Sequence, residues 1–379
     1  MSSHSALESR GVDHTQRKTP LAFRLHIDLP LLTALLVLSI FGTVILYSAS
    51  GGDLEMLTRQ ITRVAVAFTV LFIVAQTPPH WLKIITFWLF VIGLIMLIAV
   101  PLVGESHKGA QRWLNLGIFL VQPSEMMKLI IPMMVAAYLS EQHLPPEPKR
   151  LLIATAIIIF PVLLIAKQPD LGTSLLIASA GFFVLFMAGI SWKIIAGLSA
   201  SVAALLPLFW IYLMKGYQKQ RVLTFLDPES DPRGSGYHII QSKIAIGSGG
   251  GFGKGWFNGT QSQLEFLPER HTDFIFAVLA EEFGFMGVLF IFSIYLFIIF
   301  RGLTIAMEAQ ETYTRLLAGG ITMIFFTYFF VNVGMVTGLL PVVGLPLPMV
   351  SYGGTSMVTL MAAFGILMSI HTHRRLLNK

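Results

Sequence analysis

The sequence contains no cysteine and has few charged side chains. The absence of cysteine excludes disulfide bonds, thiolate catalysis and cysteine-ligated metal sites, although it does not identify the cellular compartment. Asp, Glu, Lys and Arg make up 12% of the 379 residues, about half the fraction that is usual in a soluble domain. Hydrophobic residues make up 55%, and the mean hydropathy is +0.74. Because a soluble fold of this length would expose large apolar patches, the composition predicts an integral membrane protein.

Long apolar runs recur along the whole chain. A spanning helix needs about 20 mostly apolar residues, and the candidate spans are residues 29–47, 61–76, 84–103, 126–139, 151–166, 173–190, 194–213, 274–300, 316–339 and 349–371. The first run is not followed by a cleavage-site pattern, so it is interpreted as a helix and not as a removable signal peptide. We predict an all-α, polytopic fold with about ten transmembrane helices.

Lysine and arginine in the short connections predict the orientation of these spans. With ten spans, one side would carry the basic residues of the N-terminal tail, of the connections and of the C-terminal tail: Arg10, Arg17, Lys18, Arg24, Lys149, Arg150, Lys193, Arg301, Arg315 and residues 374–379. That side is predicted to be cytoplasmic, and both termini with it. Residues 1–28 then form a cytoplasmic tail and residues 29–379 a single transmembrane domain. The net charge of +6 is explained by the membrane surface and not by nucleic acid.

Residues 215–273 form the one long polar stretch between predicted spans, and they are expected outside the cytoplasm. A connection of this length is typical of a functional loop. Its Asp-, Pro- and Gly-rich part, residues 227–234, indicates turns, and residues 237–246 have the spacing of an amphipathic helix that could lie on the membrane. A glycine-rich segment follows at residues 247–255. It lacks the Ser or Thr that a phosphate-binding P-loop has after its lysine, so the residues alone favour a mobile loop over a phosphate site.

Ionisable residues near the hydrocarbon are energetically costly and often mark function. Here most of them fall on the predicted extracytoplasmic side: Arg112, Glu125, Lys128, Lys167, Asp170, Arg221, Lys243, Lys254, Glu265, Glu269, Arg270, His271, Asp273, Glu281 and Glu282. Glu125 and Lys128 share a helix face, as a local ion pair or as the wall of a polar cavity. Asp273 is either an acid that complements a helix dipole or a general base.

Four ordered motifs carry a resemblance to a known family. They are GAQRWLNLG at residues 109–117 followed by QPSE at 122–125 and Lys128, KQPDLGT at 167–173, the segment from GYH at 236–238 to LPERHTDF at 267–274, and LPLPMVSYGGTS at 345–356. From about residue 29 to its C-terminus the chain resembles the SEDS family (shape, elongation, division and sporulation). It is more similar to the rod-shape branch, RodA, than to the cell-division branch, FtsW.

The resemblance implies a peptidoglycan glycosyltransferase in the bacterial cytoplasmic membrane. Such an enzyme polymerises lipid II on the outer membrane face, for cell-wall elongation, together with a class B penicillin-binding protein and the elongation machinery. The family's essential aspartate maps onto Asp273, and its cavity acids and base map onto Glu125, Lys128 and Glu265. The alternatives are a lipid II flippase, the FtsW-like member and a scaffold. A transporter would be expected to show charges at the midplane and paired repeats, so the charges at one face favour the enzyme.

The expected mechanism is a single displacement with inversion, in which Asp273 is the general base and no covalent nucleophile is needed. The leaving lipid diphosphate requires cations, with Mg²⁺ or Mn²⁺ as a possible addition. The predicted substrate-binding residues are Arg112, Trp113, Glu125, Lys128, Asp170, Arg221, Lys243, Lys254 and Glu265.

Overall fold

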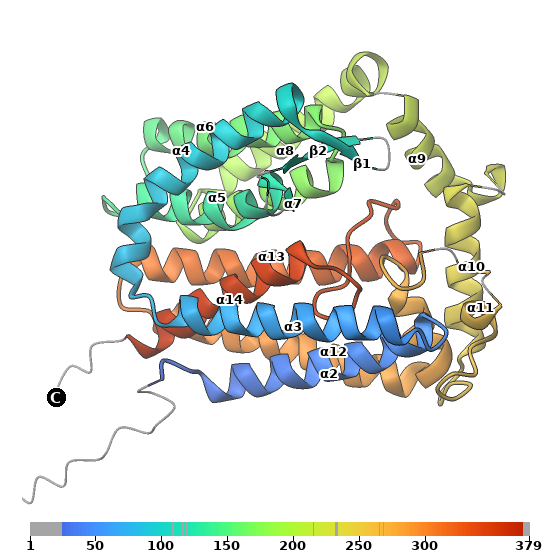
Figure 1. Ribbon diagram of the computed structural model, residues 1–379. Coiled ribbons are helices and arrows are strands. Elements are labelled where there is room, and N and C mark those ends of the chain that lie inside the picture. Colours follow the sequence, from blue (N-terminus) through green and yellow to red (C-terminus); the bar gives the residue numbers. More distant parts are fainter. Residues whose placement is uncertain are drawn as a thin grey trace, which may run out of the picture.

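The computed structural model describes residues 25–107, 110–115, 117, 120–214, 216–231, 234–264, 266–267 and 269–373. The predicted tail charges before residue 25 and after residue 373, and Glu265, lie outside the described residues. The elements are α2 (Leu29–Ala49), α3 (Leu54–Ala75), α4 (Pro79–Val103), β1 (Glu105–His107), β2 (Ala110–Asn115), β3 (Leu120–Val121), α5 (Pro123–Leu139), α6 (Pro148–Lys167), α7 (Leu171–Met187), α8 (Trp192–Leu208), η1 (Phe209–Leu213), α9 (Gly216–Leu226), η2 (Pro228–Ser230), α10 (Ser235–Ser248), α11 (Thr260–Gln263), α12 (Ile275–Glu308), α13 (Thr312–Val336) and α14 (Thr355–Thr372) (Figure 1).

The predicted all-α, polytopic fold is confirmed, and each predicted span corresponds to a helix. Within the described ranges, α2, α3, α4, α6, α12, α13 and α14 are long and apolar enough to cross a membrane. The other three, α5, α7 and α8, have 17 residues each. Several predicted boundaries were wrong by five residues or more. The second span begins at Leu54 and not at residue 61, the third begins at Pro79 and not at residue 84, the eighth ends at Glu308 and not at residue 300, and the tenth begins at Thr355 and not at residue 349. The Asp53 carboxylate accepts a hydrogen bond from the Glu55 N–H at 2.8 Å and thereby caps the earlier start of the second span.

The central helix of the bundle is α13, which packs against α5, α7, α12 and α14. Figure 1 shows two layers, with α4 to α8 in one and α2, α3, α12, α13 and α14 in the other. The start of α2 and the end of α14 lie at one end of the molecule, and α9, α10 and α11 lie at the opposite end. At the first end Asp28 pairs with Arg301 at 2.5 Å and with His371 at 3.3 Å. These pairs hold the start of α2 against the far ends of α12 and α14.

No strand was predicted in the connection between α4 and α5. This connection contains a small antiparallel sheet of order β1-β2-β3. Glu105 pairs with Trp113, and Leu114 pairs with Val121. The backbone polar groups of this segment are therefore partly satisfied within the hairpin.

The glycine-rich segment is docked on α12, which corrects both sequence-based interpretations of it. Gly284 interrupts α12 with a φ of 63° and a ψ of −161°. At this break the N–H groups of Lys254 and Gly255 donate to the carbonyl oxygens of Glu281 and Glu282, at 3.0 and 2.9 Å. Two N–H groups just past Gly284 donate back to the segment. These N–H groups are therefore paired with α12, so they do not form a phosphate cradle, and the segment is held in place.

Candidate functional site

The loop between α13 and α14, residues 337–354, joins the elements that carry the predicted site residues. The Ser351 hydroxyl donates to the carbonyl oxygen of Thr272 at 2.6 Å. The Tyr352 N–H donates to the carbonyl oxygen of His271 at 2.8 Å. This α13–α14 loop is thereby fixed to the segment that leads into α12.

Asp273 lies in that segment, half-buried, immediately before the residue that caps α12. The buried Asn332 amide donates to the carbonyl oxygen of Asp273 at 2.9 Å and to that of Leu345 at 2.7 Å. A Cβ added at Gly344 would stand 3.5 Å from Oδ2 of Asp273. The Asp273 carboxylate therefore faces the α13–α14 loop, at a position where the loop has no side chain.

Two predicted cations reach the same loop from α9 and α10. Arg221 of α9 is exposed, and its Nη1 donates to the carbonyl oxygen of Val342 at 3.3 Å. Lys243 of α10 is also exposed and lies against Gly338, where an added Cβ would meet Cε of Lys243 at 2.3 Å. The structure therefore brings Arg221 and Lys243 to the loop that Asp273 faces.

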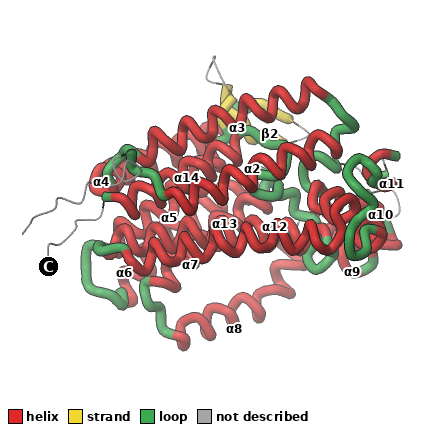
Figure 2. The backbone as a smooth tube through the Cα atoms, turned by 90° about the horizontal axis from the view of Figure 1, so that it is seen from below, coloured by secondary structure: helices red, strands yellow, loops and turns green. Residues whose placement is uncertain are grey.

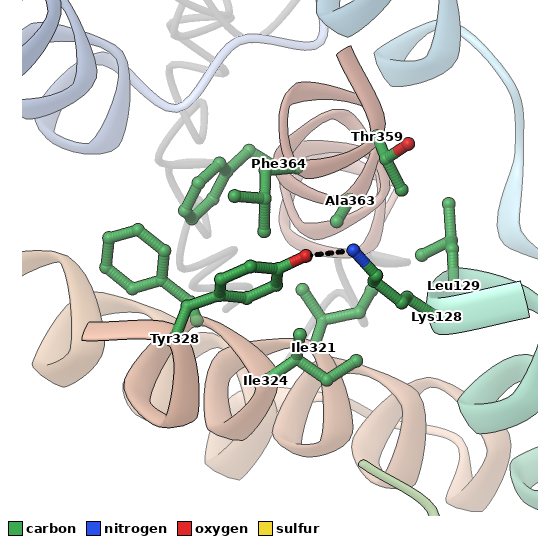
Figure 3. A pocket seen from close by; sticks show the side chains of 10 residues that line it. Lys128, Leu129, Ile321, Ile324, Tyr328, Thr359, Ala363 and Phe364 are labelled. Atoms are coloured by element: carbon green, nitrogen blue, oxygen red, sulfur yellow. Dashed lines mark hydrogen bonds between the residues drawn. The ribbon is translucent and has the colours of Figure 1, made fainter. Parts of the chain in front are cut away.

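Glu125 and Lys128 form a buried ion pair. Nζ of Lys128 lies 2.5 Å from Oε1 of Glu125, and the two side chains are 5% and 10% exposed. Lys128 also donates to the Tyr328 hydroxyl of α13 (Figure 3). The cavity beside Lys128 measures about 10 Å³, room for no more than about one water molecule. Since a buried charge needs a partner, each of these two side chains is the counter-ion of the other.

Glu125 also lines a larger cavity. Oε2 is buried and has no hydrogen-bond partner among the described residues. The cavity measures about 380 Å³ and is lined from α3, from the end of the hairpin, from α5 and from the start of α14: Thr62, Arg63, Val66, Leu120, Val121, Gln122, Glu125, Met126, Gly354, Thr355, Val358 and Thr359. Glu125 is therefore the predicted acid that has space for a ligand beside it.

Arg63 lines this cavity and was not predicted as a site residue. It lies nine residues into α3, where its guanidinium stands over the Tyr352 ring at 4.3 Å from the centroid. The predicted span began at residue 61, and Arg63 was not among the ionisable residues singled out near the hydrocarbon. A cap at Asp53 is the sequence signal that could have extended the helix and placed Arg63 inside it.

The first two motifs meet at Asp170. Its carboxylate accepts a hydrogen bond from the Thr173 N–H at 3.3 Å and so caps α7. It also accepts from the Gln122 amide at 3.2 Å and lies 3.8 Å from Nη1 of Arg112. Trp113, next to Arg112 on β2, is half-buried. These contacts fasten the hairpin to the start of α7.

Lys254 is placed at the break in α12 with the glycine-rich segment. Its Nζ lies 2.7 Å from Oε1 of Glu281, whose side chain is fully buried, and 2.7 Å from the Thr260 hydroxyl. The Gln261 N–H also donates to Glu281 at 3.0 Å. Lys254 therefore neutralises a buried carboxylate in this structure.

The described residues offer no obvious set of ligands for the Mg²⁺ or Mn²⁺ that was considered from the sequence. Within the described ranges, no group of three or more His, Asp or Glu side chains lies close enough to hold a metal ion. We derive no step through a metal.

Comparison with known proteins places the chain and its fold in one family. Residues 28–376 match the family of cell cycle proteins described as FtsW, RodA and SpoVE. The chain belongs to this family. This confirms the resemblance drawn from the four motifs.

Individual members of the FtsW/RodA/SpoVE family match over nearly the whole chain. The peptidoglycan glycosyltransferase MrdB of Escherichia coli strain K12 is 54% identical over 356 residues, which cover 94% of this chain and 96% of that protein. A probable peptidoglycan glycosyltransferase FtsW of Idiomarina loihiensis is 36% identical, over 93% of this chain and 88% of its own.

Solved structures from this family have the same fold. One, described as showing structural coordination of polymerization and crosslinking by a peptidoglycan synthase complex, has a TM-score of 0.81 at 32% identity, over 92% of this chain and 98% of its own. The rod shape determining protein RodA of Thermus thermophilus has a TM-score of 0.69 at 26% identity, over 92% and 97%.

Proposed function

We propose that this chain polymerises lipid II into glycan strands for cell-wall elongation, with Asp273 as the general base. The observation that carries the proposal is the 54% identity, over 94% of the chain, to a peptidoglycan glycosyltransferase. The chain is a peptidoglycan glycosyltransferase of the RodA kind. The FtsW relative is less similar, at 36%, so elongation is favoured over cell division.

The reaction makes three demands on the site. The acceptor hydroxyl loses its proton to Asp273 as its oxygen forms a bond to the anomeric carbon of the donor sugar. The bond from that carbon to the diphosphate oxygen breaks with its electron pair, and the α-linked donor gives a β-linked product by inversion. The departing lipid diphosphate gains negative charge. Arg221 of α9 and Lys243 of α10, which lie beside the α13–α14 loop, balance this charge. No group on the protein becomes covalently attached to the sugar.

The proposal gives each of the other predicted residues a role that agrees with its contacts. Glu125 contacts substrate from the wall of the cavity that it lines, and Lys128 is its counter-ion. Arg112 and Asp170 position the hairpin, which presents Trp113 to substrate. Lys254 is paired with the buried carboxylate of Glu281. Its proposed role in substrate binding is therefore indirect, because it holds the glycine-rich segment against α12.

The membrane arrangement follows from the same proposal. Both termini are cytoplasmic, and α9, α10, α11 and the α13–α14 loop lie on the extracytoplasmic side. An apolar cavity of about 760 Å³ between α6, α7 and α8 offers space for a lipid chain, and Figure 2 shows α8 at the margin of the bundle. The partner is a class B penicillin-binding protein, which the match to a synthase complex that couples polymerization with crosslinking supports.

The test uses purified full-length protein and labelled lipid II, with and without the transpeptidase partner. We expect Asp273→Asn to slow glycan polymerisation by at least about 100-fold, the lower end of what a general base contributes. Asp227→Asn is the matched control, because Asp227 is an exposed aspartate of the same extracytoplasmic region, and it should polymerise at the wild-type rate. Near-normal synthesis by a folded Asp273→Asn protein would overturn the assignment. Transbilayer movement of lipid II without elongation would support the flippase instead.

A further inference from the structure

The glycine-rich segment exposes a large apolar side chain almost completely. Phe252 is 84% exposed, and Trp256, directly after the segment, is 47% exposed. The main chain beside Phe252 is fixed, because the carbonyl oxygen of Gly251 accepts a hydrogen bond from the Met286 N–H of α12 at 3.1 Å. Apolar surface gains free energy when it leaves water. A phenyl ring presented from a fixed backbone therefore indicates an apolar surface that receives it.

Trp256 connects this region to the exposed apolar face of α2. Its indole N–H donates to the carbonyl oxygen of Val44 at 3.3 Å, and its ring lies 6.1 Å from that of Tyr47. Val44 and Ile40, one turn earlier, are both exposed. Since α2 is apolar enough to cross a membrane, this face is the one that contacts lipid. The lipid-facing surface of α2 therefore continues onto Trp256.

The lipid-facing surface of α12 ends at the same segment. Phe285 and Met286, directly after the break at Gly284, are both exposed. The Phe285 N–H donates to the carbonyl oxygen of Gly250 at 2.9 Å. The glycine-rich segment is thus docked on two membrane-spanning helices at the point where their exposed apolar faces end.

The height of the segment in the bilayer can be measured along both helices from the Asp28–Arg301 pair. Ionised side chains are costly in hydrocarbon, so this pair marks the edge of the hydrocarbon at the other end of the molecule (Figure 1). Val44 lies 16 residues after Asp28, and Gly284 lies 17 residues before Arg301. At 1.5 Å per residue both are about 25 Å from the pair. Since a hydrocarbon core is roughly 30 Å thick, the segment lies at its opposite edge.

We propose that Phe252 and Trp256 form an anchor that inserts into the bilayer interface, so that the partner of this surface is lipid. Tryptophan and tyrosine gather at this depth in membrane proteins because their rings are apolar and their N–H or O–H groups are polar. A protein partner could also cover two aromatic rings, but it would not require that they stand at the edge of the hydrocarbon on two separate helices.

The anchor has a consequence for the rest of α12. It fixes the height of the break at Gly284 relative to the lipid headgroups, and with it the height of Asp273, eleven residues earlier. The inference does not depend on the proposed function, because any membrane protein with this surface would insert it.

The absence of cysteine allows a single thiol to be placed at a chosen site. Phe252→Cys is labelled with a nitroxide in the full-length protein in dioleoylphosphatidylcholine nanodiscs. Electron paramagnetic resonance then measures its collisions with oxygen, which concentrates in hydrocarbon, and with a water-soluble nickel chelate. Ile40→Cys is the hydrocarbon reference, and Ser230→Cys, at an exposed site in η2, is the aqueous reference. We expect the oxygen-to-nickel ratio at position 252 to lie between those at positions 230 and 40.

A thicker bilayer supplies a second measurement. The docked segment keeps a fixed height on α2 and α12, so in dierucoylphosphatidylcholine nanodiscs, whose hydrocarbon is thicker, the anchor should lie deeper. The ratio at position 252 should then rise toward that of Ile40→Cys, whereas the ratio at position 230 should stay aqueous. Because Phe252 is exposed, the labelled variant should melt at the wild-type temperature, which shows that it is folded.

Three results would overturn the inference. They are an aqueous ratio at position 252 in both lipids, few collisions with either agent, which would mean burial within protein, and a ratio that leaves the aqueous value only when the transpeptidase partner is added. The last result would assign the surface to that partner. The wild-type preparation is also assayed for lipid II polymerisation. An interfacial ratio at position 252 without polymerisation by wild type supports the anchor and removes the proposed function alone.

Discussion

At the scale of single residues, the position of Asp273 depends on hydrogen bonds from one side-chain amide to main-chain carbonyl oxygens. Asp273 and Leu345 come from different loops, and the Asn332 amide holds both of their carbonyl oxygens. A buried carbonyl that loses its donor keeps its full desolvation penalty. The position of Asp273, the proposed general base, therefore depends on a side chain that makes no contact with substrate in the proposed mechanism.

Replacing Asn332 should therefore affect both stability and rate. Asn332→Leu has a similar volume but leaves two carbonyl oxygens without a donor, so we expect a loss of about 1–3 kcal/mol in the free energy of unfolding and slower polymerisation. Thr327→Val on the same helix is the control, because the Thr327 hydroxyl bonds only within α13, to Met323. Thermal unfolding and lipid II polymerisation measure the two effects. Equal stability and activity in both variants would contradict the assigned role.

The Lys254–Glu281 pair allows a second prediction for single residues. Removing the lysine leaves a fully buried carboxylate without its cation, which is more damaging than removing both charges. Lys254→Met should lose about 1–3 kcal/mol of unfolding free energy, and Lys254→Met with Glu281→Gln should recover part of it. A double-mutant cycle with chemical denaturation measures the coupling. Strictly additive losses would show that the two side chains act independently.

At the scale of elements, α12 is two helical pieces held together by a docked glycine-rich segment. Gly284 has a backbone conformation that side chains rarely adopt, and an added Cβ would lie 2.2 Å from the N atom of Gly253. The break cannot close into a regular helix while the segment's N–H and carbonyl groups occupy it. The glycine-rich segment can therefore dock only if α12 is broken at Gly284, and the main-chain groups freed at that break are paired only if the segment is docked.

Gly284→Ala should be strongly destabilising. We expect a loss of more than about 2 kcal/mol in unfolding free energy, since backbone strain and a clash with main-chain atoms act together. Gly247→Ala is the control, because Gly247 lies in helix α10 with open space where its Cβ would be, and it should be neutral or stabilising by up to about 1 kcal/mol. Melting temperatures of the two variants test this prediction. Equal values would show that the break at Gly284 does not depend on a residue without a side chain.

The sequence predicted some of these elements well, for identifiable reasons. Hydropathy is a property of consecutive residues, so the apolar runs marked all ten helices. Helical spacing likewise predicted α10 from residues 237–246, although the helix extends slightly beyond them. The docking of the glycine-rich segment could not be predicted, because close backbone approach to residues some thirty positions away leaves no local pattern. A run of glycines is equally typical of a mobile loop.

The candidate site was predicted unevenly for the same reason. Motifs singled out Asp273 and Glu125, and its charge near the hydrocarbon singled out Arg221. The sequence did not predict that Asp273 and Arg221 meet at the α13–α14 loop, which arises only when α9, α12 and α13 pack. Arg63 was missed because its position on the cavity wall is visible only in three dimensions. The roles of the predicted residues remain predictions until variants are assayed.

At the scale of the whole molecule, α10 contacts the segment that carries Asp273. The His238 ring of α10 stacks on Phe274, directly after Asp273, at 5.7 Å. Burial lowers the pKa of His238 below 6.5, and the nearby Glu269 and Asp231 only partly oppose this. Protonation of His238 is therefore less favourable in the folded protein than in the unfolded chain.

This shift predicts a pH dependence of stability. Between the lowered pKa and about 6.5 the unfolded chain binds more protons than the folded protein, so stability rises with pH. The contribution is present above pH 6.5 and is lost as the pH falls through the lowered pKa. Melting temperatures at pH 8 and 5.5 should differ more in wild type than in His238→Gln. His80→Gln, at an exposed site, should keep the wild-type slope, and an unchanged slope in His238→Gln would refute the coupling.

The three shortest bundle helices also affect the bilayer around the protein. A helix of 17 residues, the length of α5, α7 and α8, spans about 26 Å at 1.5 Å per residue, less than the roughly 30 Å of a hydrocarbon core. Lipid next to a short hydrophobic span compensates by thinning. Headgroups on this flank then sit nearer the midplane than elsewhere. Hydrophobic mismatch would thus bring the diphosphate of a lipid-linked substrate nearer the midplane on this flank before any side chain contacts it.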